Sequence, residues 1–106
     1  MKFNKYHNRR TEYRGVGYAS KKEAGFAAEL DLLVRAGEIK SWHRQVRIPL
    51  VVNERKIPTY IIDFEIEHNN GELEYVECKG YPTPEWRLKW KLFDALQPQV
   101  RKRVVS

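Results

Sequence analysis

Polar and apolar residues alternate in two neighbouring segments near the middle of the chain, and this pattern predicts two β-strands. Residues 60–67 read YIIDFEIE and residues 73–79 read LEYVECK. An alternation of period two places successive side chains on opposite faces of a strand. Asn69-Asn70-Gly71 lies between the two segments and is a strong turn signal. The two strands are therefore expected to form an antiparallel hairpin.

Two further strands are predicted on either side of this hairpin. Residues 43–52 place four aliphatic side chains on one face, with Gln45 and Arg47 on the other. A loop over residues 53–56 then leads into the hairpin. Residues 99–105 (QVRKRVV) are expected to add a last strand.

A first helix is predicted over residues 20–36. Ser20 and Glu23 form a capping-box pattern, and Gly37 suits the C-terminal cap. The apolar stripe of this helix consists of Phe26, Ala27, Leu30, Leu33 and Val34. Glu23 lies within the stripe, which is unusual for an acid. Two interpretations stay open: Glu23 is a functional acid that faces the sheet, or it is only the capping partner of Ser20.

A second helix is predicted from Pro84 to about Leu96, with Thr83 as its N-cap. Trp86, Trp90 and Phe93 follow one another at helical spacing. We interpret these three aromatic residues as core packing.

The length of 106 residues suits one domain, residues 1–106, with a single sheet and two or three helices, an α/β (α+β) fold. There is no apolar run of membrane length and no signal-peptide pattern, so we expect a soluble protein of the cytoplasm. Cys78 is the only cysteine, and the three histidines are scattered, so neither a disulfide nor a zinc-type cluster is expected. A bound metal would then be Mg²⁺ or Mn²⁺, which prefer oxygen ligands.

The net charge of +6 is distributed unevenly. Residues 1–22 carry seven basic side chains (Lys or Arg) and one acidic side chain. Residues 23–79 carry seven basic and eleven acidic side chains, and residues 80–106 carry six basic and two acidic ones. Two basic flanks around an acidic centre suit a polyanion that is held at its edges. Residues 1–18 are expected to form a basic arm or, from Glu12 to Tyr18, a short edge strand. The side chains expected to contact nucleic acid are Arg9, Arg10, Arg14, Lys21, Lys22, Arg87, Lys89 and Lys91.

Two candidate catalytic residues, Asp63 and Glu77, lie in the predicted hairpin. Asp63 interrupts an apolar run, where an unpaired charge would be costly. A two-residue loop would pair Asp63 with Cys78, whereas a three-residue loop, residues 69–71 with Gly71 in the left-handed conformation, pairs it with Glu77. We predict the three-residue loop, since directly opposed residues share a face and two adjacent carboxylates can then hold a divalent cation.

The order of these elements and acids resembles the PD-(D/E)xK nuclease superfamily and, more narrowly, a small phage and prophage family. The residues that carry the resemblance are Lys5-Tyr6-His7-Asn8, residues 18–24 (YASKKEA), Ala36-Gly37-Glu38-Ile39, Gln45, Tyr60 to Phe64 and Val76-Glu77-Cys78-Lys79-Gly80. Ile62 stands where the superfamily's name has proline.

The resemblance implies a restriction-endonuclease-like core, ordered helix, three strands, helix, strand, with a central mixed sheet flanked by helices. It also implies metal ligation by Asp63 and Glu77, a catalytic Lys79, a helix acid at Glu23 and a supporting polar role for Gln45. The Cys78 carbonyl is a plausible further ligand.

The expected function is metal-dependent hydrolysis of DNA by an endonuclease, by analogy with Holliday junction resolvases that act on branched phage DNA. A homodimer is expected, because a small chain covers little duplex and such enzymes cut two strands symmetrically. A phage-encoded protein would act in the host cytoplasm. Two alternatives are a basic nucleic-acid-binding module without catalysis and a structural α/β domain whose acidic centre is simply solvated.

Overall fold

The computed structural model describes residues 10–78 and 82–105. The chain forms two compact units that divide between Ile39 and Lys40. Among the described residues, no helix is both long and apolar enough to span a membrane.

The first unit contains a small antiparallel hairpin, β1 (Thr11–Tyr13) and β2 (Val16–Tyr18), followed by the helix α1 (Lys21–Arg35). Arg14 and Gly15 connect the strands with φ angles of 53° and 77°. Two successive residues with positive φ are typical of a tight hairpin turn. The prediction of a single short strand from Glu12 to Tyr18 was therefore wrong, because the chain reverses at Gly15.

Both ends of α1 follow the sequence prediction. The Ser20 hydroxyl accepts a hydrogen bond from the Glu23 N–H at 3.1 Å. At the other end Gly37 has a φ of 75°, and the Glu38 N–H donates to the Leu33 carbonyl at 2.9 Å. A left-handed glycine directly after a helix satisfies the last carbonyl groups in this way.

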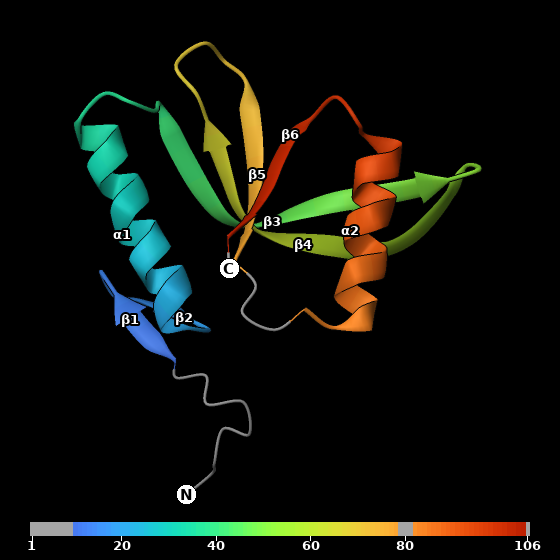
Figure 1. Cartoon of the computed structure of the whole chain (residues 1–106), viewed down its shortest axis with the longest axis horizontal. Helices are drawn as coiled ribbons and strands as arrows, with labels where there is room; N and C mark the ends of the chain where they lie inside the picture. Colours follow the sequence, from blue (N-terminus) through green and yellow to red (C-terminus); the bar gives the residue numbers. More distant parts are fainter. Residues whose placement is uncertain (1–9, 79–81, 106) are drawn as a thin grey trace, which may run out of the picture. The chain divides into compact units, whose positions relative to one another are not determined.

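The second unit contains four strands and one helix: β3 (Ser41–Val52), β4 (Arg55–Glu67), β5 (Leu73–Cys78), α2 (Pro84–Leu96) and β6 (Arg101–Val105). The strands form one sheet in the order β3-β4-β5-β6 (Figure 1). β4 is antiparallel to both β3 and β5, whereas β6 runs parallel to β5. Along the chain, α1 and these elements follow the predicted order of helix, three strands, helix and strand, and the sheet is mixed as predicted.

The connection between β3 and β4 is shorter than predicted. Val52 pairs with Arg55, and Asn53 and Glu54 form the turn with φ angles of 49° and 65°. The expected loop over residues 53–56 is thus a two-residue turn, and β4 begins five residues earlier than the apolar pattern indicated. Polar residues next to a tight turn can pair as strands although they carry no apolar alternation.

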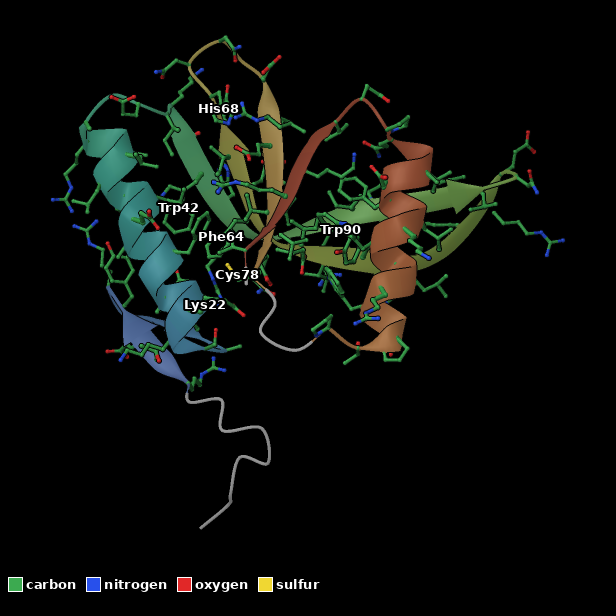
Figure 2. The ribbon with its side chains drawn as sticks, in the orientation of Figure 1. Lys22, Trp42, Phe64, His68, Cys78 and Trp90 are labelled. Atoms are coloured by element: carbon green, nitrogen blue, oxygen red, sulfur yellow. The ribbon has the colours of Figure 1, made fainter. Side chains whose placement is uncertain are left out.

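Phe93 of α2 lies at the centre of the core of the second unit. It is fully buried and packs against a cluster of four residues of β3 and β4: Ile48, Leu50, Tyr60 and Ile62. Trp90 points from α2 toward the same strands (Figure 2). Burial of a large apolar side chain contributes about 1.5–3 kcal/mol, so these contacts hold α2 on the sheet.

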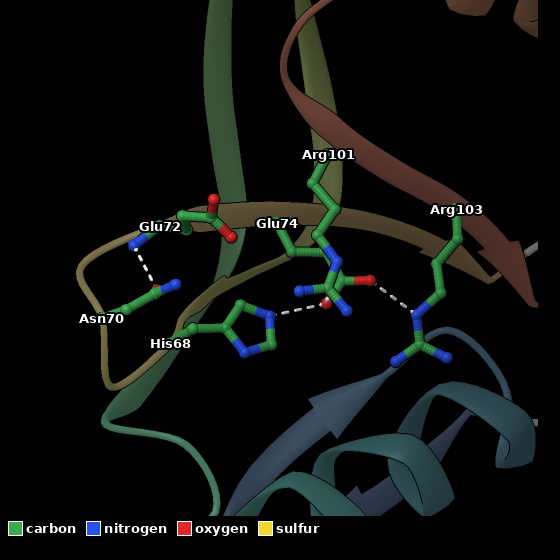
Figure 3. A network of polar contacts seen from close by, with 6 residues as sticks. All are labelled: His68, Asn70, Glu72, Glu74, Arg101 and Arg103. Atoms are coloured by element: carbon green, nitrogen blue, oxygen red, sulfur yellow. Dashed lines mark hydrogen bonds and ion pairs between the residues drawn. The ribbon is translucent and has the colours of Figure 1, made fainter.

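A polar network fixes β6 beside β5 (Figure 3). Glu74 of β5 is buried, and its Oε1 lies 2.8 Å from His68 Nε2 while its Oε2 accepts a hydrogen bond from Arg103 Nε at 2.8 Å. Arg101 Nε lies 3.8 Å from Oε1. Burial alone would raise the pKa of Glu74, but the hydrogen bond with His68 and the charges of the two arginines lower it below its usual value.

Candidate functional site

The register of the β4–β5 hairpin is the one that the three-residue loop predicts. Phe64 pairs with Val76 and Glu67 with Leu73. The His68 N–H donates to the Glu72 carbonyl at 2.8 Å, which leaves residues 69–71 as the loop, with Gly71 at a φ of 89°. Continuing the pairing by one residue beyond Phe64 places Asp63 opposite Glu77. The predicted register is therefore confirmed.

Asp63 and Glu77 hold each other's strands through reciprocal hydrogen bonds. The Asp63 N–H donates to Glu77 Oε1 at 3.1 Å, and the Cys78 N–H donates to Asp63 Oδ2 at 2.8 Å. Each carboxylate thus accepts a backbone hydrogen bond from the opposite strand, at the end of the regular pairing. The two acids that the sequence singled out lie next to each other.

Glu77 also receives a hydrogen bond from the second helix. Trp86 Nε1 donates to Glu77 Oε2 at 3.1 Å. Glu77 is only 1% exposed, and a buried carboxylate is costly unless donors compensate for the water it has lost. The Asp63 N–H and the Trp86 indole are two such donors, and they contact different oxygen atoms.

Tyr60 lies beside this pair. Its buried hydroxyl has no hydrogen-bond partner of good geometry among the described residues. Burial and, secondly, the negative charge of Glu77 raise the pKa of Tyr60 well above its usual value, so the phenol stays neutral. Tyr60 and Trp86 also line a surface pocket of about 290 Å³ together with Lys89. Tyr60 and Trp86, two neighbours of Glu77, therefore lie at the edge of a solvent-accessible pocket.

Gln45 occupies the same row of the sheet on the other side of Asp63. Arg44 pairs with Phe64 and Val46 with Ile62, so Gln45 stands opposite Asp63. Its side chain is exposed and its φ is 54°. A residue other than glycine rarely adopts this conformation within a strand, and such outliers are often found at functional sites.

The donor set suits a hard divalent cation. Asp63 and Glu77 supply carboxylate oxygens, each with more lone pairs than one hydrogen bond uses, and Mg²⁺ is often held by one or two carboxylates with water completing its shell. In the described part of the chain, no group of three or more His, Cys, Asp or Glu side chains is arranged to hold a metal ion. Asp63 and Glu77 alone thus offer two ligands, not three.

Several predicted site residues stand apart from this pair or outside the described residues. Lys79 and Arg9 lie outside the described residues. Glu23 is buried in α1 and belongs to the first unit, so its convergence with Asp63 and Glu77 stays a prediction. Cys78 is buried, and its N–H donates a hydrogen bond to Asp63. Metal ligation by the Cys78 carbonyl stays a prediction.

The predicted nucleic-acid contacts differ in their surroundings. In the first unit, Arg10, Lys21 and Lys22 are exposed, whereas Arg14 pairs with Asp31 at 3.2 Å. On α2, Lys89 pairs with Glu85 at 3.5 Å. Arg87 and Lys91 are exposed and lie one helical turn apart on the same helix. Their positive charge is therefore presented to solvent.

Sequence reasoning missed the part that Trp86 and Tyr60 play beside Glu77. It interpreted Trp86 as core packing, and the ring does pack against the core cluster. The available signal was chemical: an indole N–H that becomes buried needs an acceptor, and Glu77 is the nearest acid before the helix in the sequence.

Comparison with known proteins gives one family. A model of the family described as "Protein of unknown function (DUF1064)" matches residues 3–106. No curated protein and no solved structure matches the chain.

Proposed function

Since the chain belongs to the DUF1064 family, whose description names no activity, we propose from its own site that it is a metal-dependent endodeoxyribonuclease with a restriction-endonuclease-like core. The observation that carries the proposal is the pairing of Asp63 with Glu77 at the end of the β4–β5 ladder, where each carboxylate accepts a backbone N–H of the other strand. The order of helices and strands along the chain supports it.

A cation would add to the donors that already stabilise the two adjacent carboxylates. Negative charges that close to one another repel, and burial of Glu77 makes the repulsion stronger. Mg²⁺ or Mn²⁺, which bind carboxylate oxygens, would relieve this repulsion. Asp63 and Glu77 would hold the ion, while the role of Glu23 as a further acid stays a prediction.

In this proposal Asp63 and Glu77 would hold an ion that, when bound, would supply polarisation of the scissile phosphate and a lowered pKa of a coordinated water. The protein's own residues do the rest. Lys79, which the resemblance implies as the catalytic lysine, would orient the attacking water or stabilise the charge of the transition state. Gln45 supports the row from the side of β3.

The net charge of +6 suits DNA as the substrate, and the exposed Arg87 and Lys91 are suitable phosphate contacts. We further propose that the protein acts as a homodimer on branched DNA. This part rests on analogy with junction resolvases of the superfamily that the sequence resembles.

Cleavage of labelled linear, flapped and four-way DNA, with Mg²⁺ or with EDTA, tests the proposal. We expect the wild-type protein to cut with Mg²⁺ and to bind without cutting in EDTA. Asp63→Asn and Glu77→Gln should abolish cleavage, because each removes a charged ligand. Lys79→Ala should lower the rate by about 100- to 1,000-fold, the usual loss when one group that stabilises the transition state is removed.

All three variants should keep the DNA affinity that the wild-type protein shows in EDTA. Glu72→Gln, on the same hairpin and exposed, is the matched control and should cut at the wild-type rate. Cleavage that persists in EDTA or in Asp63→Asn would contradict the proposal. Salt-sensitive binding without cleavage of any substrate would instead favour the non-catalytic nucleic-acid-binding module, and its basic surface would then be the functional site.

A further inference from the structure

We infer that Trp86 is a positioning residue for Glu77: its indole N–H fixes the carboxylate in the orientation that binds the divalent cation. The inference rests on the proposed function and adds to it a residue of α2 that does not itself contact the metal.

The geometry around Glu77 carries the inference. Trp86 Nε1 donates to Oε2 and the Asp63 N–H donates to Oε1, both at 3.1 Å. One donor comes from a helix and the other from a neighbouring strand, so the carboxylate is held from two directions. Two hydrogen bonds to different oxygen atoms define the plane of the carboxylate and hence the direction of its remaining lone pairs.

Trp86 is itself held in place. Its backbone N–H donates to the Thr83 hydroxyl at 3.1 Å, which fixes the first turn of α2. Its ring stacks on Trp90, with 5.7 Å between the centroids and an interplanar angle of 23°. It also packs against the core cluster that includes Tyr60 and Ile62. Hydrogen-bond donors behind metal-binding carboxylates act by orienting their ligand, and they do so best when their own position is fixed by packing.

Two substitutions can distinguish the packing of the Trp86 ring from its hydrogen bond to Glu77. Trp86→Phe would keep an aromatic ring beside Trp90 and remove the N–H donor together with one ring of the indole. Trp90→Phe makes the same substitution one helical turn further on, in another half-buried ring of α2. Both variants lose the same atoms from a half-buried ring, and they form a matched pair in which Trp86→Phe alone removes the hydrogen bond with Glu77.

Mn²⁺ binding to the protein without DNA provides a measurement that is independent of cleavage. The free ion is followed by its electron paramagnetic resonance signal during a titration. We expect Trp86→Phe to weaken Mn²⁺ binding by about 10- to 100-fold, the usual effect of removing such a donor, and Trp90→Phe to bind as the wild type does. The Mg²⁺ concentration for half-maximal cleavage should rise in parallel, while DNA affinity in EDTA stays unchanged.

A second measurement uses the wild-type protein, in case Trp86→Phe does not fold. The three tryptophans give three indole N–H resonances in ¹⁵N-labelled protein. The Trp86 resonance should shift on addition of Mg²⁺ and reach a plateau at saturation, and the shift should vanish in Glu77→Gln.

Equal Mn²⁺ binding by Trp86→Phe and Trp90→Phe, or a Trp86 resonance that ignores Mg²⁺ in a protein that binds it, would overturn the inference alone. A wild-type protein that neither binds Mn²⁺ nor cuts DNA would overturn the inference together with the proposed function.

Discussion

At the scale of single residues, Glu74 has the best-defined electrostatic environment outside the candidate site. Its carboxylate is 5% exposed and is bonded to His68 and Arg103. The lowered pKa means that the folded protein binds a proton at this group less readily than the unfolded chain does. Ionised Glu74 therefore stabilises the fold above its usual pKa of 4.5, and this stabilisation is lost as the pH falls through the lower pKa of the folded state.

Substitution of Glu74 should change stability in a way that depends on pH. Glu74→Gln should lower the free energy of unfolding at pH 7 by about 1.5–3 kcal/mol, the usual range for a hydrogen bond to a charged group. The difference from the wild type should shrink as the pH falls below 4.5, where the wild-type carboxylate also becomes neutral. Urea unfolding at several pH values measures both effects.

Glu72→Gln serves again as the control, because Glu72 is exposed on the same hairpin. A surface substitution of this kind usually changes stability by less than about 0.5 kcal/mol. A difference between Glu74→Gln and the wild type that stayed constant down to the acid limit would show that Glu74 stabilises the fold by packing rather than by its charge.

At the scale of elements, the β4–β5 hairpin decides whether the site exists. Its three-residue loop sets the register, and the register sets Asp63 opposite Glu77. Gly71 adopts a φ of 89°, which residues with a side chain rarely do. The loop therefore depends on one backbone conformation that glycine alone adopts without strain.

Two glycine substitutions separate this conformational effect from the effect of steric clashes. A Cβ atom added at Gly71 or at Gly25 meets no atom within 4 Å. Gly71→Ala should nevertheless destabilise the protein by about 1–2 kcal/mol, because L-residues are strained in the left-handed region. Gly25→Ala, within α1, should stabilise it by about 0.5–1 kcal/mol, since alanine is the better helix former.

Thermal unfolding measures both substitutions. Gly71→Ala should also reduce cleavage if the strain alters the register, while Gly25→Ala should leave cleavage unchanged. Equal effects of the two substitutions on stability would contradict the idea that the left-handed conformation of Gly71 requires glycine.

At the scale of the whole molecule, the excess of positive charge would govern the proposed binding to DNA. Each phosphate contact releases counterions, so affinity should fall as a power of the salt concentration. The net charge of +6 alone does not say which side chains are responsible. The exposed Arg87 and Lys91 of α2 are two of the predicted contacts in the second unit.

The double substitution Arg87→Gln and Lys91→Gln should reduce the slope of log affinity against log salt by about 2, because each side chain that no longer binds a phosphate lowers it by about 1. Arg55→Gln with Lys56→Gln removes the same charge next to the β3–β4 turn and should leave the slope closer to the wild type. Fluorescence anisotropy with labelled DNA in EDTA measures the slopes. Equal slopes for the two double variants would mean that only net charge matters.

The sequence by itself determined the features that depend on residues close together in the chain. The caps of Ser20 and Thr83 are bonds to N–H groups three positions later, and the three-residue loop follows from Asn69-Asn70-Gly71. Because local geometry fixes such bonds, the hairpin register and the adjacency of Asp63 and Glu77 could be predicted. The two-residue turns at Arg14 and at Asn53 were missed. Neither turn is flanked on both sides by a clear alternation of apolar and polar residues.

Only the tertiary structure decided which distant side chains complete these features. Arg103 reaches Glu74 across 29 positions, and Trp86 reaches Glu77 only because packing of Phe93 on the sheet brings the start of α2 to β5. The amphipathic pattern fixes which side of α2 is buried, but not where along the sheet the helix lies. That position results from the packing of many side chains at once, and it makes an apparently ordinary core tryptophan a hydrogen-bond donor to the candidate metal ligand.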